Sequence, residues 1–151
     1  MSTTSRADRL RWLWRLSNRL ETASLRRLGF SWIALIGRRQ VLVLETTGRK
    51  TGRLRHTPVV YRLDADGRLY IGGGAGGMTR VDWVANLRAK PVAAVWMRRR
   101  RHPMIAHELT GEAYERERQE SLAISPQAAK YEQMSGRRVP YFRLDLTDQD
   151  G

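Results

Sequence analysis

A run rich in glycine, threonine and cations lies between two apolar segments in the first half of the chain. It reads Thr46-Thr47-Gly48-Arg49-Lys50-Thr51-Gly52-Arg53-Leu54-Arg55. The glycines allow a sharp turn, the threonines add hydroxyl donors, and four cations fall within seven positions. A bound phosphate or carboxylate requires such N–H donors and clustered positive charge. The run predicts an anion-binding turn, and its alternative is a basic hairpin loop in an arginine-rich protein.

A second candidate site is the glycine-rich stretch over residues 72–77 together with the helix expected after it. The stretch contains G-x-G-x-x-G, but the region about 20 positions on lacks the acidic residue of a dinucleotide-binding fold. Its glycines suit close backbone approach to a flat ligand, or else they form a plain surface loop. On the helix, Trp83 and Leu87 share a face with Asn86 beside them. They either cap a barrel or present an indole and an amide to a ligand.

The residue types argue against hydrolytic and metal chemistry. The chain has no cysteine, which excludes disulfides, thiolate metal sites and a cysteine nucleophile. His56, His102 and His107 have no ligand cluster around them, so no metal site is expected. No serine lies in a G-x-S-x-G elbow. A protein of this kind leaves the chemistry to a cofactor.

The charge of the chain limits the partners it could have. A net charge of +13 and a pI near 11.3 favour nucleic acid, an acidic membrane surface or a polyanionic cofactor. The aromatic residues do not interleave with the basic ones as in stacking readers of nucleic acid, so no specific nucleic acid is expected. No apolar stretch resembles a signal peptide or a transmembrane helix, which predicts a cytoplasmic protein.

The segment from Ala7 to Ile36 adds one qualification to that prediction. Leu10, Leu13 and Leu20 fall at helical spacing on one face, and arginines populate the other. Tryptophans near the apolar–polar boundary suit a bilayer interface. The segment predicts short amphipathic helices that dock on the inner face of the cell membrane, on the domain itself or on a dimer partner.

Apolar runs separated by turn signals predict six strands and several helices. Strands are expected over Gln40–Thr46, Arg55–Leu63, Arg68–Ile71, Val92–Met97, from the Arg98–Arg101 turn to about Thr110, and over Tyr141–Leu146. Helices are expected from Thr79 or Asp82 to Ala89, over Glu112–Ala123 and over Pro126–Met134. The turn Arg98–Arg101 is expected to be solvated, as is the helix face that carries Glu108, Glu112, Glu115, Glu117 and Glu120.

Short connections between these elements favour antiparallel neighbours. The predicted fold class is α+β, mainly β: a split β-barrel of about six mostly antiparallel strands with flanking helices and an N-terminal amphipathic helical segment. The predicted organisation is residues 1–37 for that segment, 38–147 for the barrel domain and 148–151 for a frayed tail.

Read in order, these motifs resemble the deazaflavin-dependent nitroreductase family, which includes quinone reductases. The resemblance rests on T-T-G-R-K-T-G-x-x-R-x-x-P from Thr46 to Pro58, the glycine-rich segment, and W-x-x-N-L-x-A-x-P from Trp83 to Pro91. It implies a split barrel that binds the reduced deazaflavin coenzyme F420, which has a phosphate and an acidic glutamyl tail. FMN is the alternative cofactor.

The resemblance also implies roles for individual residues. Lys50 and Arg55 would hold the phosphate, with Arg49 and Arg53 nearer the tail, and Thr51 and Pro58 belong to the same motif. Gly73, Gly74, Ala75, Gly76 and Gly77 would pass along the deazaflavin ring, with Trp83 and Asn86 lining the same groove. Hydride would pass to an electron-poor acceptor, and Tyr131, Tyr61 or solvent would supply the proton.

The chain departs from the family pattern where nitro-reducing members carry substrate-lining tyrosines. Ser125 and Ala128 stand in place of the first two tyrosines, and only Tyr131 is kept. A lipophilic acceptor such as a quinone is therefore favoured over a nitro compound or an activated alkene. A barrel that binds the coenzyme without turnover, a basic nucleic-acid or membrane binder, and a homodimer stay open.

Overall fold

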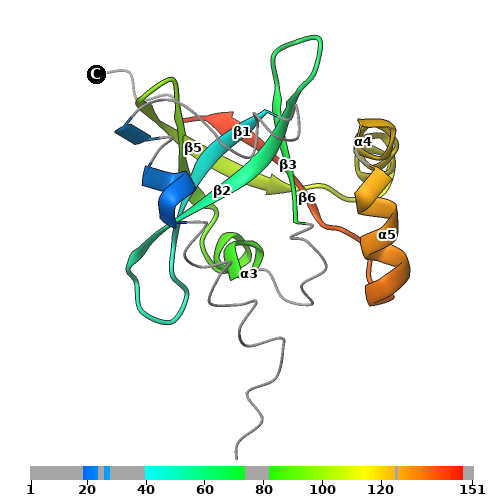
Figure 1. Cartoon of the computed structure of the whole chain (residues 1–151), viewed down its shortest axis with the longest axis horizontal. Coiled ribbons are helices and arrows are strands. Elements are labelled where there is room, and N and C mark those ends of the chain that lie inside the picture. The colour runs from blue at the N-terminus through cyan, green and yellow to red at the C-terminus, as the bar shows by residue number, and fades with distance from the viewer. Residues whose placement is uncertain (1–18, 24–25, 28–39, 74–81, 125, 148–151) are drawn as a thin grey trace, which may run out of the picture.

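The computed structural model describes residues 19–23, 26–27, 40–73, 82–124 and 126–147. Its six strands are β1 (Val41–Thr47), β2 (Leu54–Leu63), β3 (Leu69–Gly72), β4 (Val92–Met97), β5 (Arg100–Glu108) and β6 (Tyr141–Leu146). They form a closed barrel in the order β1-β2-β3-β6-β5-β4, and every pairing is antiparallel. The sequence prediction of a small antiparallel barrel is confirmed (Figure 1).

Three helices flank the barrel: α3 (Asp82–Ala89), α4 (Gly111–Ile124) and α5 (Pro126–Ser135). Helix α3 lies across one end of the barrel, and α4 and α5 lie together beside β6 (Figure 1). The predicted N-terminal segment, 1–37, lies largely outside the described residues, of which 19–23 and 26–27 are helical.

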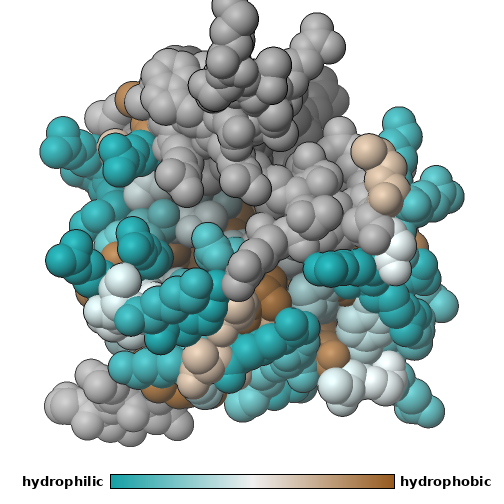
Figure 2. Space-filling model, turned by 90° about the horizontal axis from the view of Figure 1, so that it is seen from below, coloured by the Kyte–Doolittle hydropathy of each residue, from teal (hydrophilic) through white to brown (hydrophobic). Residues whose placement is uncertain are grey.

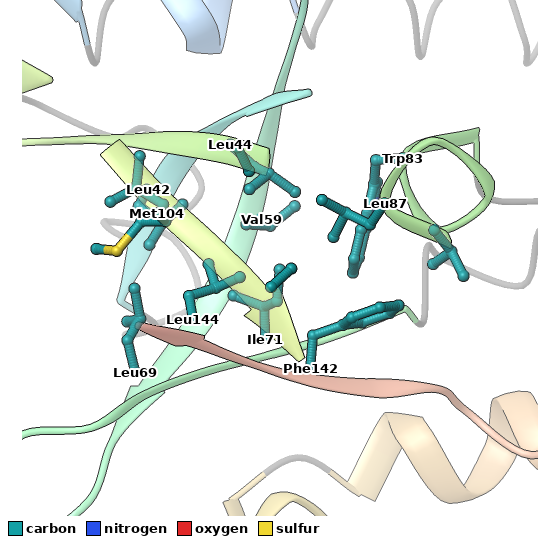
Figure 3. Packing of buried hydrophobic residues seen from close by; sticks show 14 residues of the cluster. Leu42, Leu44, Val59, Leu69, Ile71, Trp83, Leu87, Met104, Phe142 and Leu144 are labelled. Atoms are coloured by element: carbon teal, nitrogen blue, oxygen red, sulfur yellow. The ribbon is translucent and has the colours of Figure 1, made fainter. Parts of the chain in front are cut away.

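The hydrophobic core fills the barrel because alternate residues of each strand point inward. Leu42 and Leu44 of β1, for example, are fully buried and belong to a cluster to which all six strands contribute. Trp83 and Leu87 of α3 point into the open end of this cluster (Figure 3). The Trp83 ring lies 5.8 Å from that of Phe142. Burying a side chain such as Leu87 stabilises the fold by roughly 1.5–3 kcal/mol, so α3 is fixed in place by its apolar face.

The β2–β3 connection is a tight hairpin turn whose sequence, Asp64-Ala65-Asp66-Gly67, is typical of such turns. Asp64 Oδ1 accepts hydrogen bonds from the backbone N–H groups of Asp66 and Arg68, at 2.9 and 2.8 Å. Gly67 takes a φ of 79°, which its missing Cβ allows.

The prediction of a fully solvated acidic face on α4 is wrong for Glu117. This side chain is 3% exposed, and its two oxygens accept hydrogen bonds from Nε and Nη2 of Arg62 on β2. Ser121 donates a further bond to Oε1 at 3.0 Å. A buried carboxylate needs such partners. Glu117 therefore links α4 to the barrel wall.

The predicted basic turn is shorter than Arg98–Arg101. Only Arg98 and Arg99 form the β4–β5 turn, with φ values of 47° and 66°, and β5 begins at Arg100. A two-residue hairpin turn of this kind usually carries Asn-Gly, because left-handed backbone costs other residues about 1–2 kcal/mol each. Arg101 is not merely solvated, since it binds a buried carboxylate described below.

Candidate functional site

The anion-binding turn predicted from the sequence is a six-residue loop, Gly48 to Arg53, between β1 and β2. The Gly48 N–H donates to the Arg53 carbonyl at 2.7 Å, and the Gly52 N–H donates to the Gly48 carbonyl at 2.8 Å. Gly52 has a φ of 68°, a conformation that favours glycine. The loop therefore folds back on itself and turns Lys50 and Thr51 toward solvent.

Asn86 of α3 fixes this loop to the barrel. Its Oδ1 accepts hydrogen bonds from the Arg49 backbone N–H at 3.1 Å and from Arg49 Nη1 at 3.2 Å. Its Nδ2 donates to Thr46 Oγ1 at 3.2 Å. Asp82 adds a longer contact of 3.5 Å to Arg49. Because Asn86 and Thr46 are both buried, they link the core to the exposed tip of the loop.

A cavity of about 1080 Å³ lies against this loop. Its walls come from the loop, the start of β2, helix α3, Trp96 of β4 and the helical residues 19–27 that are described. The lining residues are Arg19, Thr22, Ala23, Arg26, Arg27, Gly48, Arg49, Lys50, Thr51, Leu54, Arg55, His56, Thr57, Asp82, Trp83, Asn86 and Trp96. Figure 2 looks at the end of the molecule that carries α3, where most described side chains are hydrophilic with apolar patches between them.

Two cations of this cavity, Lys50 and Arg55, differ from five of the arginines outside it. Arg62, Arg88, Arg118, Arg138 and Arg143 each pair with a carboxylate within 3.0 Å. Within the described part of the chain, Lys50 and Arg55 form no ion pair with a carboxylate. Unpaired cations that line one concave surface attract an anionic ligand.

A buried carboxylate stands behind the cavity wall. Glu45 of β1 has a side chain only 5% exposed, and Oε1 accepts bonds from Arg101 Nε and Nη2 at 3.1 and 2.7 Å. Its Oε2 accepts from Trp96 Nε1 at 3.2 Å and lies 3.0 Å from His56 Nε2. Burial alone would raise the pKa of Glu45, but hydrogen bonds from Arg101, Trp96 and His56 lower this pKa to about 2. Glu45 is ionised and holds two cavity-lining rings in place.

Comparison with known proteins identifies the family. A sequence model described as F420H(2)-dependent quinone reductase matches residues 17–145. The chain belongs to this family. It is an F420H2-dependent reductase, and its cofactor is coenzyme F420.

Solved structures agree with this assignment of the reductase. An F420-H2 dependent reductase (FDR-A) is 27% identical, with a TM-score of 0.60 over 70% of this chain and 93% of that one. A domain-swapped dimer is 23% identical, with a TM-score of 0.63 over 90% of this chain and 98% of that one. A heme binding protein from Mycobacterium smegmatis is 16% identical, with a TM-score of 0.55 over 72% and 47% of the two chains. The last two structures show only that their fold is similar to that of this chain.

The cavity of the reductase fits an anionic coenzyme. Its lining includes the unpaired cations Lys50 of the loop and Arg55 of β2, together with the buried Trp83 and Asn86. Arg49 differs from its neighbours, because Asn86 and Asp82 already engage its guanidinium. Arg49 is therefore an internal anchor of the loop, whereas Lys50 of the loop and Arg55 of β2 are free to meet a ligand.

The structure brings most but not all of the predicted site residues together. Arg49, Lys50, Thr51, Arg55, Trp83 and Asn86 line the one cavity. Arg53 is exposed but does not line it, and Pro58 lies further along β2 opposite Val43. Tyr61 packs partly buried against the barrel core, four residues beyond the cavity-lining Thr57, or about 13 Å along the strand.

Some predicted site residues lie where the structure describes less. Gly74, Ala75, Gly76 and Gly77 are outside the described residues, and Tyr131 is in α5 but its side chain is not described. Gly73 is described, and its N–H donates to the Pro140 carbonyl at 2.8 Å. A Cβ at Gly73 would lie 2.8 Å from Pro140 Cγ and 2.9 Å from Val84 Cγ2. Packing therefore requires glycine at this position.

Sequence reasoning missed the Glu45 network, and it identified the arginines of the N-terminal segment without placing them at the cavity. Arg26 stacks over the Trp96 ring at 4.7 Å, so this part of the N-terminal segment meets the cavity wall. The one signal for Glu45 was an acidic residue within the otherwise apolar β1. His56 lies opposite Glu45 in the β1–β2 hairpin, whereas Trp96 of β4 and Arg101 of β5 reach Glu45 only because the barrel closes.

Two further sequence expectations concern absences. Among the residues that the structure describes, no group of three or more histidine, aspartate or glutamate side chains could hold a metal ion. Within the same residues, no helix has the length and apolar character needed to cross a membrane.

Proposed function

We propose that the reductase holds coenzyme F420 in the cavity beside the Gly48–Arg53 loop. The observation that carries the proposal is the pair of unpaired cations, Lys50 and Arg55, at the rim of a cavity whose base is fixed by Asn86. Lys50 would act as a point charge on the phosphate, and Arg55 would add bidentate hydrogen bonds. Arg53, exposed on the same loop, lies nearer the acidic tail in this arrangement.

The other predicted cofactor residues take supporting parts in this proposal. Arg49 and Asn86 hold the loop, Thr51 adds a hydroxyl donor, and Trp83 supports the ring end of the cavity. By the family resemblance residues 73–77 would pass along the deazaflavin ring, and Pro58 restricts the strand after the loop. The bound coenzyme supplies a hydride. The protein orients coenzyme and acceptor and keeps water from the reacting atoms.

We infer that the acceptor is a quinone. The family description supports a quinone, and Ser125 and Ala128 replace tyrosines that nitro-reducing relatives carry. Nitro compounds and activated alkenes are electron-poor acceptors of the same kind and belong in the same screen. Because Tyr61 does not line the cavity, the structure gives it no support as the proton donor.

We further propose that the N-terminal segment contacts a membrane surface and that the protein forms a homodimer. Leu20 of the helical residues 19–23 is 63% exposed, so at this position the predicted apolar face does not pack on the barrel. A membrane surface could bring a lipophilic quinone to the cavity. Co-sedimentation of the protein with anionic vesicles tests this contact, and light scattering tests the dimer. Since Arg19 and Arg26 line the cavity, deletion of residues 1–36 is also expected to weaken coenzyme binding.

Charge reversal tests the phosphate site. Lys50→Glu or Arg55→Glu removes an attraction and adds a repulsion beside an anion, about 2–4 kcal/mol in total. The Kd for F420 should therefore rise roughly 30- to 1000-fold. Arg116→Glu is the matched control, because it makes the same change at an exposed arginine of α4 that does not line the cavity. Equal losses for all three variants would mean that the binding is diffuse attraction and that the localised phosphate site is wrong.

A further inference from the structure

His56 lies in the cavity wall with one ring nitrogen held by the protein. Its Nε2 is 3.0 Å from Glu45 Oε2. Among the described residues, no group bonds its Nδ1. We propose that His56 donates the proton that completes reduction of the quinone, and that Glu45 is a positioning residue that fixes the imidazole for this step. The inference rests on the proposed function, because the proton is needed only where coenzyme and quinone meet.

The contacts of Glu45 determine which nitrogen carries the hydrogen. An ionised carboxylate only accepts hydrogen bonds. Glu45 accepts two from Arg101 and one from Trp96, so its short contact with His56 requires a hydrogen on Nε2. In the neutral ring Nδ1 is then bare, and in the imidazolium it carries the transferable proton. With Arg101 bound to it, Glu45 stays ionised and does not take that proton itself.

The other described side chains that line the cavity are poor proton donors. The guanidinium groups and Lys50 are too basic to give up a proton readily near neutral pH, and Thr51, Thr57 and the tryptophans do not ionise there. Asp82 is 80% exposed and already pairs with Arg49 at 3.5 Å. Imidazole both gives and regains a proton in this pH range. His56 is thus the described cavity-lining side chain suited to acid catalysis.

Charges of both signs face His56. Glu45 from β1 is the negative one, and Arg101 from β5 is bound to the same carboxylate. Lys50 of the loop, Arg55 of β2 and Arg26 over Trp96 add positive charge. An anionic coenzyme beside the loop would add negative charge to this surrounding.

The proton balance of the step is simple. The quinone receives two electrons and one hydrogen nucleus as hydride, and an O–H bond then forms at its anionic oxygen as the Nδ1–H bond breaks. The neutral imidazole regains a proton from solvent. In sum, a hydride and a proton leave the reduced coenzyme and the same number enters the quinone, so no net proton is consumed.

Substitution of the two carboxylate-paired histidines provides the kinetic test. His56→Gln keeps a donor for Glu45 but cannot act as an acid near neutral pH. With a naphthoquinone as acceptor, kcat should fall at least about 100-fold, while KM and the Kd for F420 change less than threefold. The wild-type kcat should fall as pH rises past neutrality, and the variant should lose this dependence. His107→Gln is the control, since His107 pairs with Asp145 at 3.1 Å outside the cavity. A kcat within threefold of wild type for His56→Gln, with the pH profile intact, would overturn the proposal.

A test without coenzyme examines the positioning by Glu45. Nitrogen NMR of the imidazole rings at pH 9, with His56→Gln used for assignment, should show His56 with hydrogen on Nε2 and a bare Nδ1. Glu45→Gln should lose this preference. A His56 ring with hydrogen on Nδ1 in the wild type would overturn the role of Glu45. Failure of the wild-type protein to bind F420 at all would refute the proposed function, and it would leave the NMR result unaffected.

Discussion

The loop that carries the candidate phosphate site is held by one side chain, so Asn86→Ala is the most informative single change. This substitution removes three hydrogen bonds, two from Arg49 and one to Thr46, with lengths of 3.1, 3.2 and 3.2 Å. Each hydrogen bond contributes about 0.5–1.5 kcal/mol net, and the buried Thr46 hydroxyl would be left without this partner. Arg49 is half-buried, so water can replace part of what it loses. We therefore expect the free energy of unfolding to fall by about 2–3 kcal/mol.

This loss can be measured by thermal denaturation and by calorimetric titration with F420. In a domain of this size, 1 kcal/mol shifts Tm by roughly 2–4 °C, so Tm should fall by roughly 5–10 °C. The loop would also lose its order before binding, and the Kd for F420 should rise at least about tenfold.

Two further variants distinguish the loss of hydrogen bonds that hold the loop from a change in charge beside it. Asn86→Asp keeps the acceptor for Arg49, so stability should fall by less than about 1 kcal/mol, while its new negative charge should weaken F420 binding most at low salt. Asp82→Asn removes only an exposed 3.5 Å contact and should change stability by less than about 0.5 kcal/mol. An Asn86→Ala protein with wild-type Tm and Kd would refute the claim that this side chain holds the loop.

Three further predictions concern stability. The pKa of Glu45, lowered to about 2 from 4.5, gives roughly 3 kcal/mol of stability that is present above pH 4.5 and is lost as pH falls toward 2. Urea unfolding at several pH values should show this loss, and Glu45→Gln should reduce it. Replacing Arg98 and Arg99 by Asn and Gly should raise stability by about 1 kcal/mol in thermal unfolding, since both have positive φ; no gain would mean that the turn is not strained. Gly73→Ala should lower stability by about 1–3 kcal/mol, because its Cβ would meet the rigid ring of Pro140 at 2.8 Å; an unchanged Tm would contradict this packing.

The strands of this barrel could be predicted because their signals are local. Alternating apolar residues and the turn chemistry of Asp64 and Gly67 place the first three strands within two residues of their observed ends. The solvated face predicted for α4 failed at Glu117 for the opposite reason. Its partner, Arg62, is 55 residues away, and a helical pattern of charges says nothing of which charge will meet the barrel.

The candidate site also has some residues that could be predicted from the sequence and others that could not. Lys50, Arg55 and Asn86 could be identified because each stands in a motif with a fixed spacing. Glu45, His56 and Trp96 could not, because β1 and β4 become neighbours only when the barrel closes, although β1 and β2 form one hairpin. Arg49 shows a further limit: its charge is visible in the sequence, but its commitment to Asn86 is visible only in the fold.

Titration of the purified protein with F420 and, separately, with FMN at moderate salt tests the central claim most directly. Coenzyme fluorescence reports binding in each case. We expect F420 to bind tightly and in preference to FMN, with an affinity that falls as salt rises and is lost in Lys50→Glu. Equal binding of FMN, or F420 binding unchanged in Lys50→Glu, would contradict a phosphate site built from the Gly48–Arg53 loop.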